Sequence, residues 1–400
     1  MSSVYLDYNA TAPIRPEAAE AVARALQVGG NPSSVHAAGR AARAIVEQAR
    51  ERVAALVGGP TSTVVFTSGG TEANALGIES AVATGSRRLI VGATEHDCVR
   101  ATAEASGAAV DIWPGDANGV ADLEWLTARL KRWDAADGRP FAALMLANNE
   151  TGVIQPVAEA AALLREHDGW LHVDAVQAAG KIVVDSRALG ADTLAVSAHK
   201  LGGPHGVGAL TFGPRASLAR RIHGGGQERG RRAGTENVAG IAGFGAAATP
   251  PPVGGGEGAG GWRCILPSVE SIPPPPTPPR KGEGSLWAAS VLKREAGVVV
   301  FGESAPRLAN TLCFAAEGFA SELQVMALDL AGVMVSAGAA CSSGKVRPSH
   351  VLTAMGHADL AACAIRVSGG WATTEQDWVR FADAWLHAHA RHLARRQSAA

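Results

Sequence analysis

Short apolar stretches that end in polar residues recur along this chain, and they constrain its fold more than any other feature. They lie at residues 63–67, 88–93, 142–147, 170–174 and 193–196, and a turn or a helix-forming segment follows each one. Short runs that are apolar throughout are typical of strands buried on both faces. Strands that alternate with helices build a parallel sheet covered on both sides. The sequence therefore predicts an α/β fold around a mostly parallel sheet.

The stretch at 193–196 leads directly into Ser197, His199 and Lys200. Open parallel sheets bind ligands at the carboxyl ends of their strands, which makes this turn a candidate site. A lysine amine among apolar residues and glycines can lose its proton, and a neutral amine forms a Schiff base with a carbonyl. Taken alone, the turn is better explained by an ordinary solvated lysine. Lys200 becomes a candidate covalent anchor only when the polar residues at the other strand ends are considered with it.

A glycine-rich turn follows the stretch at 63–67. Ser68, Gly69, Gly70 and Thr71 come just before an alanine- and leucine-rich helical segment. The free N–H groups and positive dipole end of a helix N-terminus favour an anion, usually phosphate, and Thr71 would add a hydroxyl donor. The spacing matches neither the Walker pattern nor GxGxxG, which disfavours a nucleotide loop. A plain helix-capping turn remains the alternative.

The polar residues at these strand ends are expected to share one edge of the sheet. An aldehyde cofactor with a ring nitrogen and a phosphate needs a lysine, an acid for the ring nitrogen, a flat group against the ring, and donors for its phosphate and phenolic oxygen. Each residue alone has a plainer interpretation as a helix cap or a surface residue, but together they offer a candidate for every task. The candidates are Thr71, His96, Asn149, Asp174, Gln177, Ser197, His199 and Lys200.

Composition limits the partners. The 400 residues include 36 Lys and Arg against 37 Asp and Glu, so we expect no nucleic acid or membrane surface as partner. A glycine- and arginine-rich stretch at 224–232 suggests a nucleic-acid-binding tail, but it is short. No run reaches the roughly 20 apolar residues of a membrane span, and the first residues lack a signal-peptide pattern. The five cysteines lack CxxC spacing, which predicts no metal site and a cytoplasmic protein.

Cys341 differs from the other cysteines in its surroundings. It heads a stretch rich in Ser, Gly, Lys and Pro, which predicts a flexible polar loop with positive flanks. Such surroundings favour a thiolate and allow it to move. On these grounds alone, a structural thiol is an equally good interpretation. The cysteines that lack such a setting are Cys98, Cys264, Cys313 and Cys363.

Six segments, in order along the chain, resemble the motifs of NifS/IscS-type cysteine desulfurases, pyridoxal-phosphate enzymes of aminotransferase class V with the fold-type I architecture. They are residues 5–11, 68–74, 148–152, 172–177, 197–200 and 224–230. The resemblance implies that Lys200 holds pyridoxal 5'-phosphate and that Asp174 pairs with its ring nitrogen. It implies that His96 stacks on the ring and moves protons, and that Gln177 meets the phenolic oxygen. The positions that match the phosphate site are Gly70, Thr71, Ser197 and His199.

The same resemblance extends to the substrate and the partners. Thr235 matches a threonine that reaches the phosphate of the neighbouring subunit, which implies a homodimer. Arg366 matches the arginine that binds the carboxylate of L-cysteine, with Asn149 alongside the substrate and the cofactor. A planar guanidinium suits that task because it donates two hydrogen bonds to one carboxylate. Cys341 falls at the position of the family's mobile, persulfide-forming cysteine. Gly369 stands where the family usually has a leucine.

Residues 249–285 depart from the family pattern. The segment is rich in proline and glycine, has no helical or strand period, and lies where the family continues with a long helix. We expect a disordered or extended insertion, and favour a tolerated surface insertion over a proline-rich docking segment. The expected organisation is a large cofactor-binding domain at 14–248, this insertion, and a smaller α+β domain formed by 1–13 and 286–400.

The predicted function is that of a pyridoxal-phosphate-dependent cysteine desulfurase. L-cysteine would become L-alanine, and the sulfur would remain as a persulfide on Cys341. An acceptor such as an iron–sulfur scaffold protein would then take the sulfur for cluster assembly or thiolation. Two alternatives stay open at this point: a selenocysteine lyase, and a sulfur-assembly scaffold whose site the insertion has disabled.

Overall fold

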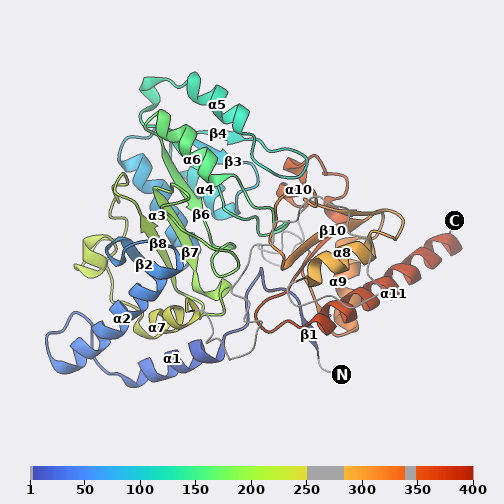
Figure 1. Cartoon of the computed structure of the whole chain (residues 1–400), viewed down its shortest axis with the longest axis horizontal. Helices are drawn as coiled ribbons and strands as arrows, with labels where there is room; N and C mark the ends of the chain where they lie inside the picture. Colours follow the sequence, from blue (N-terminus) through green and yellow to red (C-terminus); the bar gives the residue numbers. More distant parts are fainter. Residues whose placement is uncertain (1–2, 250–282, 338–347, 400) are drawn as a thin grey trace.

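A seven-stranded sheet forms the centre of the larger lobe in the computed structural model, which describes residues 3–249, 283–337 and 348–399 (Figure 1). Its strands pair in parallel except for β8, which is antiparallel to both of its neighbours. The α/β fold with a mostly parallel sheet is thus confirmed. In order across the sheet the strands are β2 (Val64–Thr67), β8 (Gly208–Phe212), β7 (Thr193–Ser197), β6 (Trp170–Asp174), β5 (Phe141–Ala143), β3 (Arg88–Gly92) and β4 (Ala109–Trp113).

Helices cover both faces of this sheet. The face formed by Leu89, Val91 and Trp170 packs against α3 (Gly70–Ala83) and α4 (Asp97–Ala105). Alternate strand residues such as Leu171 and Val173 point to the opposite face, because successive side chains on a strand alternate. The helices of that second layer are α1 (Pro16–Gln27), α2 (Ala37–Leu56), α5 (Leu123–Lys131), α6 (Val157–Glu166) and α7 (Val238–Ala247).

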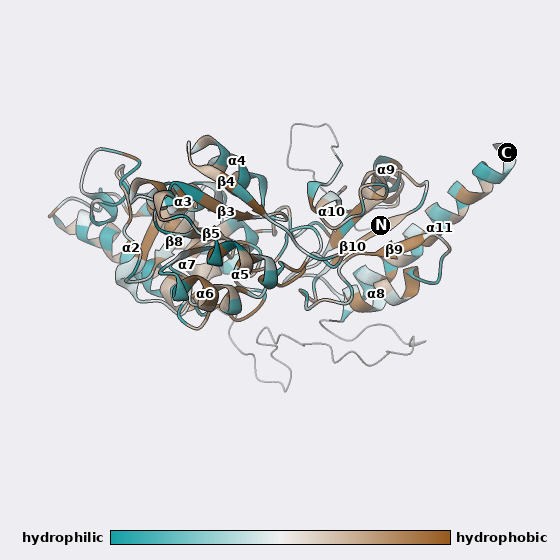
Figure 2. Ribbon diagram, turned by 90° about the horizontal axis from the view of Figure 1, so that it is seen from above, coloured by the Kyte–Doolittle hydropathy of each residue, from teal (hydrophilic) through white to brown (hydrophobic). Residues whose placement is uncertain are grey.

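A smaller lobe lies beside the first, as the view from above shows (Figure 2). Its core joins Leu6, Phe314 and Trp385. An antiparallel sheet has the order β12 (Ala364–Ser368), β10 (Thr311–Ala316) and β9 (Val298–Val300), and β1 (Val4–Tyr5) pairs in parallel with β11 (Val333–Met334). The helices of this lobe are α8 (Gly284–Leu292), α9 (Ser321–Leu330), α10 (His350–Ala354) and α11 (Glu375–Ala399).

The N-terminal segment connects the two lobes. Asp7 forms a bridge to Ser368 at the end of β12, so the chain starts in the smaller lobe. A few residues later, the N–H of Ala12 donates to the carbonyl of His199 at 2.9 Å, and the N–H of Arg15 donates to that of Gly202 at 2.8 Å. The segment therefore passes directly over the turn that holds Lys200.

Some elements differ from the sequence-based expectation. The strand expected at 142–147 is shorter in the structure, where β5 ends at Ala143. The chain continues alongside β6, since the N–H groups of Leu144 and Leu146 donate to β6 carbonyls at 3.0 and 2.8 Å. Helix α8 begins at Gly284, inside the segment expected to be an insertion. The rest of that segment, 250–282, lies outside the described residues, and the proposed domain boundaries stay predictions.

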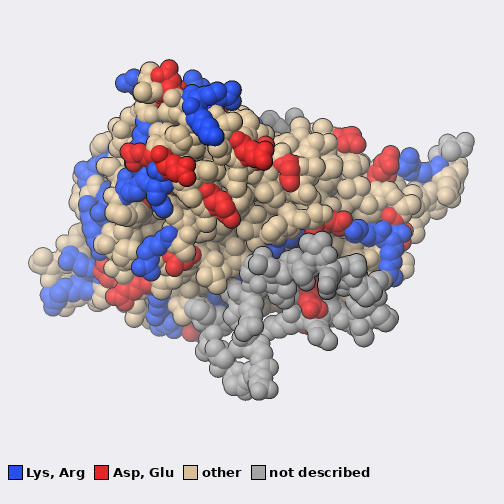
Figure 3. Space-filling model, turned by 45° about the horizontal axis from the view of Figure 1, so that its top comes forward, with Lys and Arg blue, Asp and Glu red and all other residues tan. Residues whose placement is uncertain are grey.

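The described surface carries both signs of charge. Lys and Arg side chains alternate with Asp and Glu over the face shown in Figure 3. In the ranges that the structure describes, no helix has the length and apolar character needed to cross a bilayer.

Candidate active site

The carboxyl ends of four strands, β2, β3, β6 and β7, bring predicted site residues to one edge of the large sheet. Asp174 and Ser197 are the last residues of β6 and β7, and Lys200 closes a short 3-10 turn (Ala198–Lys200) directly after β7. His96 precedes α4, in the loop after β3, and Thr71 lies in the first turn of α3, after β2. Because β2 is antiparallel to β8, and β8 to β7, β2 and β7 run the same way and end at the same edge.

Asp174 is held as a hydrogen-bond acceptor at this edge. It is 6% exposed. One carboxylate oxygen accepts from the N–H of Val176 at 2.9 Å, and the other accepts from Nδ2 of Asn74 at 2.8 Å. Each carboxylate oxygen therefore has an N–H donor from the chain. The arrangement suits a partner for a protonated ring nitrogen.

Three of the four residues predicted to hold a phosphate lie at the N-terminus of α3, namely Gly70, Thr71 and Ser197. A Cβ at Gly70 would lie 2.8 Å from Cγ2 of Val176 and 3.4 Å from Cβ of Ser197, so this approach requires glycine. Nδ1 of His199 lies 3.1 Å from Oγ1 of Thr11. Burial, followed by the charges of Lys200 and His205, lowers the pKa of His199 to about 4. His199 is therefore neutral near pH 7.

Lys200 meets the N-terminal segment. Its Nζ donates to the carbonyl oxygens of Asn9 and Ala10 at 2.6 and 2.8 Å. A pocket opens beside Lys200, and Tyr8 and Trp371 contribute to its lining from the other lobe. The lysine thus lies at the junction of the two lobes.

Asn9 connects the polar residues of this junction, although the sequence analysis assigned it no role. It is 1% exposed. Its carbonyl also accepts from Nε2 of Gln177 at 2.8 Å, and its Oδ1 accepts from Nζ of Lys181 at 2.7 Å. Its Nδ2 donates across to Oγ1 of Thr311 at 2.9 Å and to the carbonyl of Asn149 at 3.1 Å. Asn9 lies in residues 5–11, which resemble a family motif, but no local sequence pattern predicts that it makes these contacts.

Lys181 is a second amine close to Lys200. Its Nζ donates to Oε1 of Gln177 at 2.6 Å, which turns the amide N–H of Gln177 toward the site edge. Burial, then the charges of Lys200 and Arg366, lowers the pKa of Lys181 well below that of an ordinary lysine. The sequence reasoning did not single out this residue.

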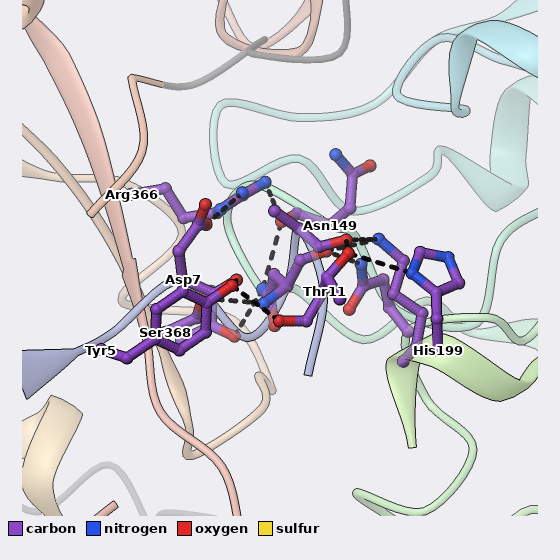
Figure 4. Close-up of polar contacts among 12 residues, drawn as sticks. Tyr5, Asp7, Thr11, Asn149, His199, Arg366 and Ser368 are labelled. Atoms are coloured by element: carbon purple, nitrogen blue, oxygen red, sulfur yellow. Dashed lines mark hydrogen bonds and ion pairs between the residues drawn. The ribbon is translucent and has the colours of Figure 1, made fainter. Parts of the chain in front are cut away.

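Arg366 reaches the same junction from β12 of the smaller lobe. It is 3% exposed. One terminal nitrogen pairs with Oδ1 of Asp7 at 2.8 Å and the other donates to the carbonyl of Asn149 at 3.1 Å. In Figure 4, Arg366 and His199 lie at opposite ends of this polar cluster, with Asn149 and Thr11 between them. Within the described part of the chain, the buried Nε of Arg366 has no partner, which leaves a donor for a ligand.

Comparison with known proteins agrees with this architecture. The family model described as "Aminotransferase class-V" matches residues 4–249 and 282–381. A protein of Dictyoglomus turgidum named "Cysteine desulfurase IscS" is 38% identical over 383 residues, covering 94% of this chain and 91% of that protein. The chain belongs to the cysteine desulfurases of aminotransferase class V. A "Cysteine desulfurase" of Cereibacter sphaeroides is 41% identical over 363 residues, covering 89% of this chain and 87% of the other.

Solved structures of this family share the fold. The structure titled "X-ray structure of NifS-like protein from Rickettsia africae ESF-5" has a TM-score of 0.81 and 28% identity, and the match covers 97% of this chain and 99% of that chain. These findings confirm the predicted family, enzyme class and fold-type I architecture. The relatives' names favour the predicted function over a selenocysteine lyase or an impaired scaffold.

The donor set at the sheet edge fits the cofactor of the family, pyridoxal phosphate. A buried carboxylate, a glycine-permitted approach to a helix N-terminus, and a lysine amine lie at neighbouring strand ends. His96 caps α4, with Nδ1 accepting from the N–H of Cys98 at 3.1 Å. In a neutral ring, the proton is then on Nε2. The individual roles predicted for these residues stay predictions.

Two predicted residues fall elsewhere. Thr235 is exposed in the turn before α7, next to Gly234, whose N–H donates to Oε1 of Gln227 at 3.2 Å. Cys341 lies outside the described residues. The chain after it rejoins the site through Ser349, whose hydroxyl donates to the buried Oε2 of Glu150 at 2.6 Å. His350 also reaches the site, where its Nε2 lies 2.9 Å from the carbonyl oxygen of Glu95, the residue before His96.

Proposed function

We propose that this chain converts L-cysteine to L-alanine with bound pyridoxal 5'-phosphate and leaves the sulfur as a persulfide on Cys341. The observation that supports this most is the meeting of Lys200, from the large sheet, with the cluster around Arg366, from the smaller lobe. A similar solved chain, titled "SspA in complex with cysteine", has a TM-score of 0.73 and 27% identity over 92% of this chain and 98% of that chain. Its title supports cysteine as the substrate.

The cofactor is assigned to the residues at the sheet edge. Pyridoxal 5'-phosphate, when bound, supplies an electron-withdrawing ring that stabilises negative charge at the substrate Cα. Lys200 would hold the cofactor covalently, Asp174 would pair with its ring nitrogen, and Gln177 would donate to its phenolic oxygen. The remaining cofactor contacts are assigned to Gly70, Thr71, His96, Asn149, Ser197 and His199, with Thr235 contributed by the second subunit of a homodimer.

The chain's own residues then bind the substrate and move its protons. Arg366 binds the substrate carboxylate through its planar guanidinium, with Asn149 beside it. Lys200 removes the Cα proton as a general base, and His96 supplies a proton from Nε2. The Cys341 thiolate bonds to the substrate sulfur as the bond from carbon to sulfur breaks. Cysteine and one thiol thereby give alanine and one persulfide, with no other oxidant or reductant.

The persulfide then passes to an acceptor. We assign this role to a sulfur-acceptor or iron–sulfur scaffold protein in the cytoplasm. The flexible polar loop that the sequence predicts around Cys341 would suit transfer, because the sulfur must leave the site.

The test is alanine release from L-cysteine by the cofactor-loaded protein in the presence of a dithiol. Cys341→Ala is expected to reduce turnover by at least about a hundredfold while cofactor binding is kept. Cys363→Ala is the matched control, because Cys363 is also a free cysteine and is half-buried in the smaller lobe, and it should turn over at the wild-type rate. Unimpaired alanine release by Cys341→Ala would refute the proposed role.

A further inference from the structure

A continuous run of hydrogen bonds leads from Asp174 into the core. Nδ2 of Asn74, on α3, donates to Asp174 at 2.8 Å, and Oδ1 of Asn74 lies 2.9 Å from Nε2 of His172. Nδ1 of His172 lies 2.9 Å from Oγ1 of Thr193, and Nε1 of Trp170 donates to the same oxygen at 3.1 Å. All five side chains are buried.

The two ends of this run determine the direction of every hydrogen bond in it. An ionised carboxylate only accepts, so Asn74 must present its NH₂ group to Asp174 and its oxygen to His172. Nε2 of His172 must then carry the proton, which leaves Nδ1 of a neutral ring to accept from the hydroxyl of Thr193. Trp170 only donates, and the Thr193 oxygen accepts from it. Every hydrogen bond in the run that leads from Trp170 to Asp174 thus pairs one donor with one acceptor.

The surroundings of His172 keep the ring neutral and in place. A Cβ at Gly77 of α3 would lie 2.5 Å from Nδ1 of His172, so only glycine leaves room for the ring. Phe141 stacks against it, with ring centroids 6.5 Å apart and planes at 16°. Burial lowers the pKa of His172 to about 3, so the ring carries no charge near neutral pH. The second N–H of Asn74 donates to Sγ of Cys98 at 3.3 Å, which fixes its amide further.

We propose that Asn74, His172, Thr193 and Trp170 form a proton-ordered relay that orients Asp174 toward the ring nitrogen of the cofactor. His172 acts as the neutral tautomer with its proton on Nε2. These residues are positioning residues, since only Asp174 is assigned a contact with the cofactor. The assignment to the ring nitrogen rests on the proposed function, whereas the tautomer of His172 does not.

The first measurement is the tautomer of His172 in the full chain without cofactor, read from the ¹⁵N shifts and long-range ¹H–¹⁵N couplings of its ring. The relay predicts a single tautomer protonated at Nε2. A ring protonated at Nδ1, or at both nitrogens near neutral pH, would overturn the proposal. Because this measurement needs no cofactor, it decides the relay even if the wild-type chain binds no pyridoxal phosphate. That binding result would refute both the proposed function and the assignment to the ring nitrogen.

The second measurement uses a matched pair of variants at Thr193, which Asn74 and His172 separate from Asp174 in the relay. Thr193→Val keeps the shape but removes the hydroxyl, and Thr193→Ser keeps the hydroxyl. We expect Thr193→Val to change the absorption spectrum of the bound cofactor and to weaken cofactor affinity by about tenfold. Thr193→Ser should retain the wild-type tautomer and spectrum, with affinity within about twofold. A Thr193→Val protein with wild-type spectrum and affinity would refute the relay.

Discussion

Two sides of this site are built in different ways. The acid side consists of Asp174 and the buried residues behind it, and the lysine side consists of Lys200, Arg366 and Asn9. Asp174, Asn74 and His172 belong to one strand and one helix of the larger lobe, and they are closed off from solvent. Lys200 and Arg366 instead come from different lobes, and Asn9 connects their surroundings. The acid side is therefore fixed as soon as the large sheet folds. The lysine side depends in addition on how the two lobes meet.

The pH dependence of stability should show the closed character of the acid side, and it is the largest effect we expect. Burial lowers the pKa of His172 to about 3 in the folded chain from an ordinary value of 6.5, so this residue binds one more proton in the unfolded chain between these values. His172 alone should therefore contribute a rise in the free energy of unfolding of about 1.4 kcal/mol per pH unit across this window, or roughly 5 kcal/mol in all. This contribution is complete above pH 6.5 and is lost as the pH falls toward 3.

Urea unfolding at several pH values checks this prediction. In His172→Gln, the slope of the free energy of unfolding against pH should be smaller than in the wild type by the contribution of one proton. His223→Gln, at an exposed histidine, serves as the control. Equal slopes for the wild type and His172→Gln would show that His172 is not held neutral.

Removal of the Asn9 side chain should loosen the lysine side. Asn9→Ala deletes three hydrogen bonds, to Lys181, Thr311 and Asn149, and leaves buried polar groups unpaired. We expect a loss of about 2–4 kcal/mol in the free energy of unfolding, measured by chemical denaturation. Asn118→Ala, on a turn of the larger lobe, should change stability by less than about 0.5 kcal/mol. Equal losses in both variants would show that Asn9 does not connect the lobes energetically.

Arg366 tests the lysine side through substrate binding. Arg366→Lys keeps the charge but loses the planar fork, so we expect kcat/KM for L-cysteine to fall about tenfold to a hundredfold, mostly through KM. Arg187→Lys is the control, since the Arg187 side chain is 77% exposed. If Arg366→Lys keeps the wild-type KM, the substrate carboxylate binds elsewhere.

The acid side was also the part that could be predicted from sequence. Asp174 and Ser197 each follow an apolar run, and parallel strands bring such ends together at one edge. Asn74 and Asn9 lie in segments that resemble family motifs, but their contacts could not be predicted. Asn74 contacts a residue about 100 positions away, and Asn9 contacts residues more than 100 positions away. No local pattern records such pairings. Strand β8 was missed for a similar reason, because it inserts between β2 and β7 against the parallel repeat.

Lys200 is proposed to hold the cofactor, and Lys181 is another lysine close enough to take that role. Both amines contact Asn9, and burial lowers the pKa of Lys181 in a way that would favour a reactive neutral amine. The direct measurement is borohydride reduction of the pyridoxal-phosphate-loaded chain, followed by peptide mapping by mass spectrometry. We predict a pyridoxyl label on the peptide that contains Lys200, and none in Lys200→Ala. A label on Lys181, or no label on the wild-type chain, would contradict the account.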